Sequence, residues 1–240
     1  MKINLQTIVL LCICLSSTYA ISADFVYRID SRPPSEIFSR GFSSYGNNMI
    51  FIDHVSGRSC HRTGDSAFIA TTSSLESARR IADAMFFARR NESRRLYLYT
   101  IRADRNFYNI TPTVDELEDR GEFFRPELHA MMINQREVVS VRNIPTENIQ
   151  SVTPIDYDGS THQITDGISQ SNAAYRELSS NINQGVIPRV RLSTGEPISR
   201  ISAFGLLFSS CFYSYNSNKS YDEFYNAIPV LNRIMVGNLP

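Results

Sequence analysis

Residues 24–30 read Asp24-Phe25-Val26-Tyr27-Arg28-Ile29-Asp30, and two prolines follow at positions 33 and 34. The segment is rich in β-branched and aromatic residues, and proline cannot continue a sheet, so we predict a β-strand that ends before the prolines. Arg28 lies inside this apolar strand. A buried guanidinium needs an anionic partner, which an internal carboxylate or a ligand phosphate would supply. Arg28 is therefore the first candidate functional residue.

Helices and strands alternate after this segment. We predict a short helix over residues 35–40 with Gly41 as its C-cap. Residues 67–72 predict a strand, and the capping box of Ser73 and Glu76 predicts that a helix starts at about residue 74 and runs to residue 90. Further strands are predicted at residues 96–101, 137–141 and 148–157, with a helical or looped connection at residues 112–133. This order indicates an α+β protein with mostly short strands.

The N-terminus has the pattern of a secretory signal peptide. Lys2 precedes an apolar run at residues 8–15, and small and polar residues follow up to Ala20. The apolar run is too short to span a membrane, and no later run is long enough either. We expect residues 1–20 to be removed on export through the periplasm. The remaining chain of about 220 residues fits one domain with a C-terminal appendage.

Charge and cysteine content narrow the classes of function. The 24 Lys and Arg residues balance 24 Asp and Glu residues, so no basic face for nucleic acid is expected. Once the signal peptide is removed, Cys60 and Cys211 are the remaining cysteines, and we expect them to form a disulfide in an oxidising compartment. His54 and His61 lie near Cys60, but no second ligand pair has metal spacing, so no metal site is expected.

The C-terminal part of the chain gives weaker signals. The path of residues 160–208 is not evident from their pattern, because long apolar runs are few. Ser and Asn make up seven of the twelve residues at 209–220, which is typical of a linker. The apolar segment at residues 221–236 is interrupted by Pro229 and is suited to docking. We therefore divide the mature chain into a domain at residues 21–208 and a linker with a docking tail at residues 209–240.

Residue patterns alone identify no reaction. The sequence lacks the P-loop, GxSxG, HExxH and GxGxxG motifs. Glu137 opens a predicted strand and could point into a cleft, although a glutamate at a strand end is more often exposed to solvent.

Eight segments, in order and at near-identical spacing, resemble the enzymatic subunit of pertussis toxin. The resemblance covers residues 24–157 well, and later only residues 209–211. The ADP-ribosyltransferase subunits of the Salmonella ArtA and typhoid-toxin type look closer still. The segments are YRIDSRPP (27–34), GF (41–42), GNN (46–48), DHVSGRSC (53–60), AFIATTSS (67–74), RADRNFY (102–108), QRE (135–137) and IPTENI (144–149).

This resemblance implies a pertussis- and cholera-like ADP-ribosyltransferase fold, with short mixed strands around an NAD cleft and a C-terminal docking tail. NAD would be a substrate, with no metal. Glu137 would stabilise the oxocarbenium-like transition state through the ribose 2′-hydroxyl, Arg28 would hold the phosphate and ribose region, and His54 would help to activate the acceptor. The resemblance makes Glu137, His54, Arg28 and Gln135 catalytic, and it assigns NAD binding to Tyr27, Arg28, Asp30, Arg32, Tyr45, Thr71, Thr72 and Ser73.

The sequence also departs from its relatives in motifs of the implied active site. The strand motif Ser-Thr-Ser of many relatives reads Ala70-Thr71-Thr72 here, so the first hydroxyl is missing. Tyr45 replaces a tryptophan, and stacking on NAD would survive this change. Gln135 stands where relatives that modify arginine have glutamate, which favours a cysteine or asparagine acceptor.

The resemblance further implies a secreted toxin subunit that acts in the host cytosol. The expected substrate is an inhibitory-class heterotrimeric G-protein α subunit, and the tail would thread into a pentamer of receptor-binding B subunits. The disulfide would hold the C-terminal region over the NAD cleft until host reductants open it. Two rival functions remain: an NAD glycohydrolase, and an inactive ADP-ribosyltransferase-like module that only binds a partner.

Overall fold

The structure is a computed structural model, and it describes residues 24–56, 59, 64–87, 90–124 and 126–193. The expected signal peptide, both cysteines of the expected disulfide and the docking tail lie outside these residues. No helix within the described ranges is long and apolar enough to cross a membrane.

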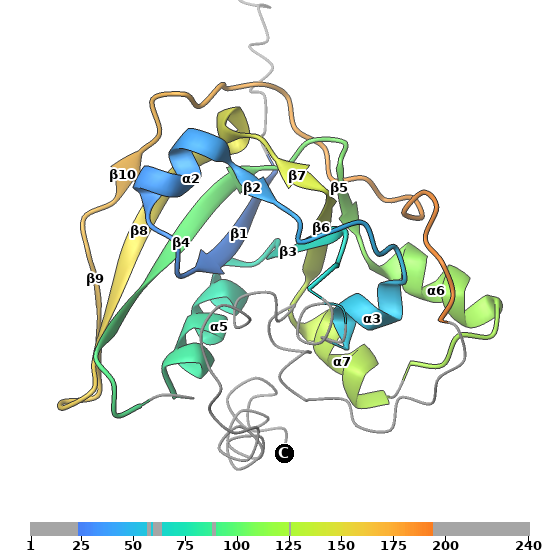
Figure 1. Cartoon of the computed structure of the whole chain (residues 1–240), viewed down its shortest axis with the longest axis horizontal. Coiled ribbons are helices and arrows are strands. Elements are labelled where there is room, and N and C mark those ends of the chain that lie inside the picture. The colour runs from blue at the N-terminus through green and yellow to red at the C-terminus, as the bar shows by residue number, and fades with distance from the viewer. Residues whose placement is uncertain (1–23, 57–58, 60–63, 88–89, 125, 194–240) are drawn as a thin grey trace, which may run out of the picture.

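An antiparallel sheet runs through the middle of the molecule (Figure 1). Its strand order is β10-β8-β4-β1-β3-β6-β5, and β9 pairs with β8 at the side of this path. A second sheet contains only β2 and β7. The strands are β1 (Phe25–Asp30), β2 (Phe42–Ser43), β3 (Phe68–Thr72), β4 (Arg94–Arg102), β5 (Phe107–Asn109), β6 (Glu137–Val141), β7 (Asn143–Ile144), β8 (Ile149–Asp158), β9 (Gln163–Asp166) and β10 (Gln170–Ser171).

Helices and the small sheet cover the two faces of the large sheet. In Figure 1, α2, β2 and β7 lie above the sheet, and α3, α5, α6 and α7 lie below it. Each face has its own apolar core: Phe51, Phe68 and Phe86 belong to one core, and Phe42 and Tyr99 to the other. The helices are α2 (Pro34–Arg40), α3 (Phe51–Val55), α5 (Leu75–Phe87), α6 (Thr111–Asp119), α7 (Pro126–Asn134) and the 3₁₀ helix η1 (Thr146–Asn148).

The structure confirms the predicted α+β class and most of the predicted elements. One detail was wrong: the Oγ of Ser74, not Ser73, accepts the capping hydrogen bond from the Ser77 amide, at 3.1 Å. The Ser73 hydroxyl instead donates to the carbonyl of Arg136. Gly41 ends α2 as predicted, with φ of 73°. A side chain here would overlap the carbonyl oxygen of Ile144, so glycine is required.

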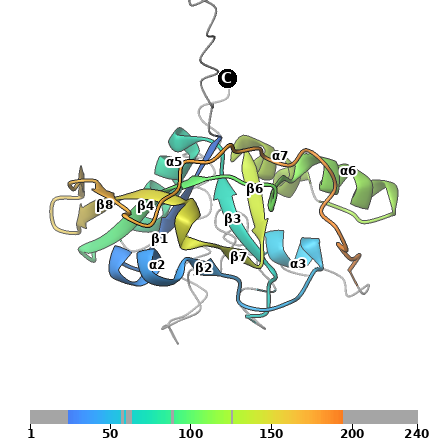
Figure 2. The same cartoon turned by 90° about the horizontal axis from the view of Figure 1, so that it is seen from above.

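The segment whose path was not evident from the sequence is described as far as residue 193. After β10 it crosses the top of the molecule and descends beside α6 (Figures 1 and 2). Main-chain hydrogen bonds tie it down: Arg176 N donates to Glu147 O, Asn183 N to Phe107 O, and Arg191 N to Met49 O, at 2.8–3.0 Å. Residues 172–193 therefore pack on the same body as the large sheet.

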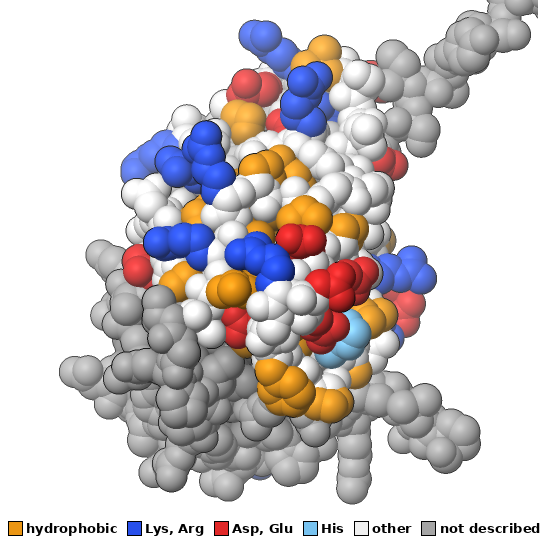
Figure 3. Space-filling model, turned by 90° about the vertical axis from the view of Figure 1, so that its right-hand side faces the viewer, with side chains coloured by type: hydrophobic (Ala, Val, Ile, Leu, Met, Phe, Trp, Pro, Cys, Tyr) orange, Lys and Arg blue, Asp and Glu red, His pale blue; other side chains and the backbone are white. Residues whose placement is uncertain are grey.

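Both signs of charge appear together on the face that carries α6 (Figure 3). The acidic side chains of α6 at positions 115, 116, 118 and 119 are exposed. This mixture agrees with the balanced composition and gives that face no uniformly basic surface.

Candidate active site

Three central strands bring candidate residues into one row. Tyr27 of β1 lies directly opposite Thr72 of β3, and Thr72 lies opposite Glu137 of β6. Directly opposed residues of an antiparallel pair share a face of the sheet. Residues more than 100 positions apart therefore line one continuous strip.

Glu137 is buried rather than exposed, which corrects the expectation based on residue type alone. Its side chain is 8% accessible. Burial raises its pKa from 4.5 to about 8, because the charged form loses its water. The carboxyl oxygen Oε1 lies 3.9 Å from Nε2 of His54. A carboxyl with a raised pKa next to an imidazole is the kind of pair that occurs at functional sites.

His54 lies on α3 and is completely buried. Burial, followed by the positive charge of Arg28, lowers its pKa to about 3. The imidazole is therefore neutral near pH 7, whereas a free histidine titrates near neutrality. Its Nε2 atom, which faces Glu137, forms no hydrogen bond with the described residues.

Ser66 holds the imidazole from the other side. Its Oγ lies 2.8 Å from Nδ1 of His54 and accepts a hydrogen bond from the Phe68 amide at 3.2 Å. The hydroxyl proton of Ser66 is then available to Nδ1, which favours the tautomer with its proton on Nε2. Ser66 fixes the ring so that this proton faces the Glu137 carboxyl.

An arginine and carboxylate cluster lies at the end of β1. Asp30 is fully buried and accepts hydrogen bonds from Arg28 Nε at 3.2 Å and from Arg32 Nε and Nη2 at 2.9 and 2.7 Å. Burial alone would raise the pKa of Asp30, but the bonds from Arg32 and the charge of Arg28 outweigh it and lower the pKa. Both guanidinium groups also lie 5.3 Å from the centre of the Phe42 ring. An internal carboxylate thus supplies the anion that Arg28 was expected to need.

The last two residues of β3 support the turn before Glu137 and the start of β6. Thr71 Oγ1 donates to the carbonyl of Val138 at 2.6 Å, and Thr72 Oγ1 donates to that of Gln135 at 2.5 Å. Gln135 is itself buried, with 5% exposure. These threonine hydroxyls bond to main-chain carbonyls, so both threonines hold β6 and its preceding turn in place.

Position 70 contributes to the site through its main chain. Arg28 Nη1 donates to the carbonyl oxygen of Ala70 at 2.7 Å, a contact that needs no side chain. Tyr45 is 47% exposed and lies within electrostatic range of Arg28 and Arg32. Its ring is therefore accessible beside the arginine cluster.

The structure brings most predicted residues together and adds two that the sequence did not single out. Ser66 and Phe42 contact His54 and the arginines, respectively. Phe42 was part of a matched segment but carried no role, and Ser66 lay just outside one. Within the described ranges no cluster of three metal-ligating side chains occurs, and Cys60 and His61 lie outside those ranges.

Residues 22–191 match the family described as "Pertussis toxin, subunit 1". The chain belongs to this family. It is 36% identical to pertussis toxin subunit 1 of Bordetella pertussis over 165 residues, which are 62% of this chain and 60% of that protein. It is 41% identical over 96 residues to the ADP-ribosylating toxin CARDS of Mycoplasma pneumoniae, covering 40% of this chain and 16% of that toxin. The solved structure of EcPltA superposes with a TM-score of 0.67 at 41% identity, covering 72% of this chain and 99% of that one.

These findings confirm the family inferred from the eight motifs and its α+β fold. The chain spans about 60% of the length of the pertussis relative that it matches. The matched region ends at residue 191, close to the last described residue.

Proposed function

We propose that this chain is a secreted toxin subunit that cleaves NAD and transfers ADP-ribose to a host protein. The observation that carries the proposal is the buried Glu137 carboxyl, which faces His54 and shares a strip of the sheet with Tyr27 and Thr72. The ADP-ribosylating activity named for the CARDS relative supports it.

The reaction breaks the bond between ribose C1′ and nicotinamide, and the electron pair leaves with the nicotinamide ring. Positive charge develops at C1′, and a fixed carboxylate next to it lowers the barrier. We assign this task to Glu137, which would also accept a hydrogen bond from the ribose 2′-hydroxyl. Arg28 and Arg32, whose guanidinium groups are held in position by Asp30, would donate hydrogen bonds to the phosphates.

The acceptor atom then bonds to C1′ and gives up a proton. A carboxylate with a pKa of about 8 is a better proton acceptor near neutrality than an imidazole with a pKa of about 3. We therefore assign proton removal to ionised Glu137 and the orientation of that carboxyl to His54. Accordingly, kcat/KM for NAD should rise between pH 6 and about pH 8, as Glu137 of the free enzyme loses its proton.

The deciding experiment incubates reduced mature protein with labelled NAD and mammalian cell lysate, beside Glu137→Gln. A labelled protein band that the variant fails to produce would support transfer, and mass spectrometry of the band would identify acceptor and residue. An inhibitory-class G-protein α subunit modified on cysteine or asparagine is the expected product, since Gln135 replaces the glutamate of arginine-specific relatives.

The same assay separates the rival functions. Release of nicotinamide without any labelled protein would indicate an NAD glycohydrolase. Neither product would indicate a module that only binds a partner. Glu116→Gln, an exposed glutamate on α6, is the matched control and should behave as the wild type.

Assembly and activation form the remaining part of the proposal. The tail at residues 209–240 would dock into a B-subunit pentamer, so deletion after Ser217 should abolish assembly. Co-purification of the truncated chain with the pentamer would contradict this.

The Cys60–Cys211 bridge would hold the C-terminal region over the NAD site until it is reduced in the host cytosol. Equal NAD turnover by oxidised and reduced protein would exclude such a latch.

A further inference from the structure

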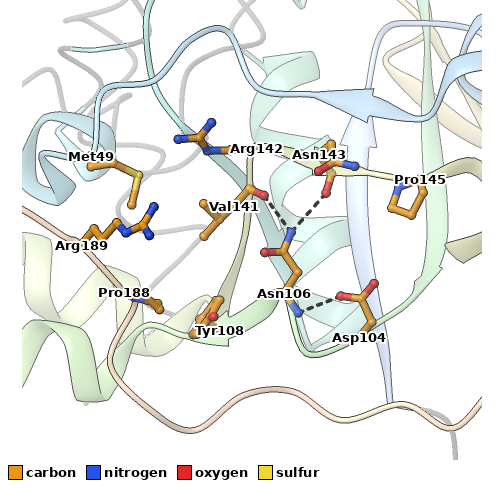
Figure 4. Close-up of a pocket in the computed structure, with 10 residues that line it drawn as sticks. All are labelled: Met49, Asp104, Asn106, Tyr108, Val141, Arg142, Asn143, Pro145, Pro188 and Arg189. Carbon is orange, nitrogen blue, oxygen red and sulfur yellow. Dashed lines mark hydrogen bonds between the residues drawn. The ribbon is translucent and has the colours of Figure 1, made fainter.

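A groove with a volume of about 550 Å³ lies at the end of β6 that is far from Glu137. Figure 4 shows its walls: Tyr108 of β5, the β6–β7 junction, Met49 before α3, and residues 188 and 189 of the C-terminal segment. Its size is within the range of ligand sites. Neither Glu137 nor His54 lines it.

Two arginines face each other across the groove. Figure 4 shows the guanidinium groups of Arg142 and Arg189 directed toward the same space beside Met49. Both residues adopt left-handed backbone conformations, with φ of 73° and 62°, which few non-glycine residues do. The Arg142 amide donates to Ala67 O at 2.8 Å and its carbonyl accepts from Ser44 N at 2.6 Å. The main chain thus fixes the direction in which the Arg142 side chain leaves the backbone.

Neither guanidinium has an anionic partner among the described residues, although other arginines do. Arg28, Arg79 and Arg95 each pair with an aspartate. The acid in the groove wall, Asp104, is already held: its oxygens accept hydrogen bonds from Asn106 N at 2.8 Å and from a side-chain amide at 2.7 Å. Two like charges therefore face one hollow, and a bound anion would relieve their repulsion.

We propose that this groove binds an acidic segment of the protein acceptor, an inference that rests on the proposed function. Two forked guanidinium groups suit carboxylates. The apolar walls formed by Met49, Tyr108 and Val141 suit the side chains between the acidic groups. Val141 is four residues from Glu137 along β6, about 13 Å at the rise of a β-strand. An extended segment of about four residues spans this distance, so an acceptor anchored in the groove reaches the reacting ribose.

The test measures binding of a fluorescent octapeptide of alternating Glu and Ala to the full mature protein by anisotropy, with a Gln/Ala octapeptide as the neutral probe. Arg142→Glu/Arg189→Glu should weaken binding of the acidic peptide at least tenfold. Arg142→Lys/Arg189→Lys, which keeps both charges, should retain most of the binding of the acidic peptide. This result would show that both positions tolerate substitution. Arg40→Glu/Arg176→Glu, with the same charge change at exposed positions outside the groove, should bind as the wild type.

Three results would overturn the inference. Equal binding of the acidic and neutral peptides would show no charge recognition. Equal loss in the groove and control variants would show a general charge effect. Displacement of the peptide by inorganic phosphate at millimolar concentration would show a site for small anions instead of a protein segment.

Nicotinamide release from NAD distinguishes failure of this inference from failure of the proposed function. The groove variants should release nicotinamide at the wild-type rate while their KM for the protein acceptor rises at least tenfold. Wild-type protein that binds the peptide but releases no nicotinamide would refute the proposed function and leave the groove as an acidic-peptide site.

Discussion

The buried pair of Glu137 and His54 should leave a signature in the pH dependence of stability. Burial raises the pKa of Glu137 from 4.5 to about 8 and lowers that of His54 from 6.5 to about 3. Between pH 4.5 and 6.5 the pair in the folded protein therefore holds one proton, which is on Glu137. The same two groups in the unfolded chain also hold one proton in this range, which is on His54. The contribution of the pair to stability is thus level there.

Above pH 6.5 this balance ends. The unfolded chain then carries no proton on either group, while folded Glu137 keeps its proton up to about pH 8. A group whose pKa is raised on folding loses its stabilising effect as the pH rises through that pKa. Over 1.5 pH units the loss is about 2 kcal/mol, at about 1.4 kcal/mol per unit. Glu137→Gln removes this loss and leaves the rise in stability between pH 3 and 6.5 that neutral His54 produces.

The assay is urea unfolding of the mature protein at intervals from pH 5.5 to 8. The free energy of unfolding of the wild type, relative to that of Glu137→Gln, should fall by about 2 kcal/mol between pH 6.5 and 8. For a chain of this size, this corresponds to a fall of roughly 4–8 °C in Tm. Glu116→Gln should not reproduce the change. A difference between wild type and Glu137→Gln that stays constant from pH 6.5 to 8 would refute the reasoning, because Glu137 would then not titrate in that range.

Other substitutions test the supports of the site. Asp30→Asn leaves two arginines without their carboxylate and should lower the free energy of unfolding by about 3–5 kcal/mol in urea. It should also raise the KM for NAD. An unchanged KM would argue that Asp30 does not position the arginines for NAD. Ser66→Ala should slow nicotinamide release while Ser66→Thr restores it, and equal rates would show that the bond to His54 does not orient the ring. Gly41→Ala forces a side chain against the carbonyl of Ile144 at positive φ and should lower stability by more than 1 kcal/mol; an unchanged urea midpoint would contradict it.

The local pattern of the sequence was enough for the longer strands and for α2 and α5, but it did not predict the short elements β2, β5, β7, β9, β10 and α3. β-Branched and aromatic residues predicted β1, β3, β4, β6 and β8, because strand propensity is a property of residues close in the chain. The same holds for α2, whose end at Gly41 follows from one backbone angle. The motifs that identified the family are also local segments, so their order and spacing sufficed to identify it.

The tertiary structure alone decided the electrostatics of the site. The sequence named Glu137 and His54, but not that both are buried with pKa values shifted in opposite directions. Ser66 is twelve positions from the histidine that it holds, and Thr71 bonds to a carbonyl 67 positions away. Arg142 and Arg189 meet only because the C-terminal segment returns to the end of β6. Burial and charge pairing depend on which distant residues exclude water from one another, and no local pattern records that.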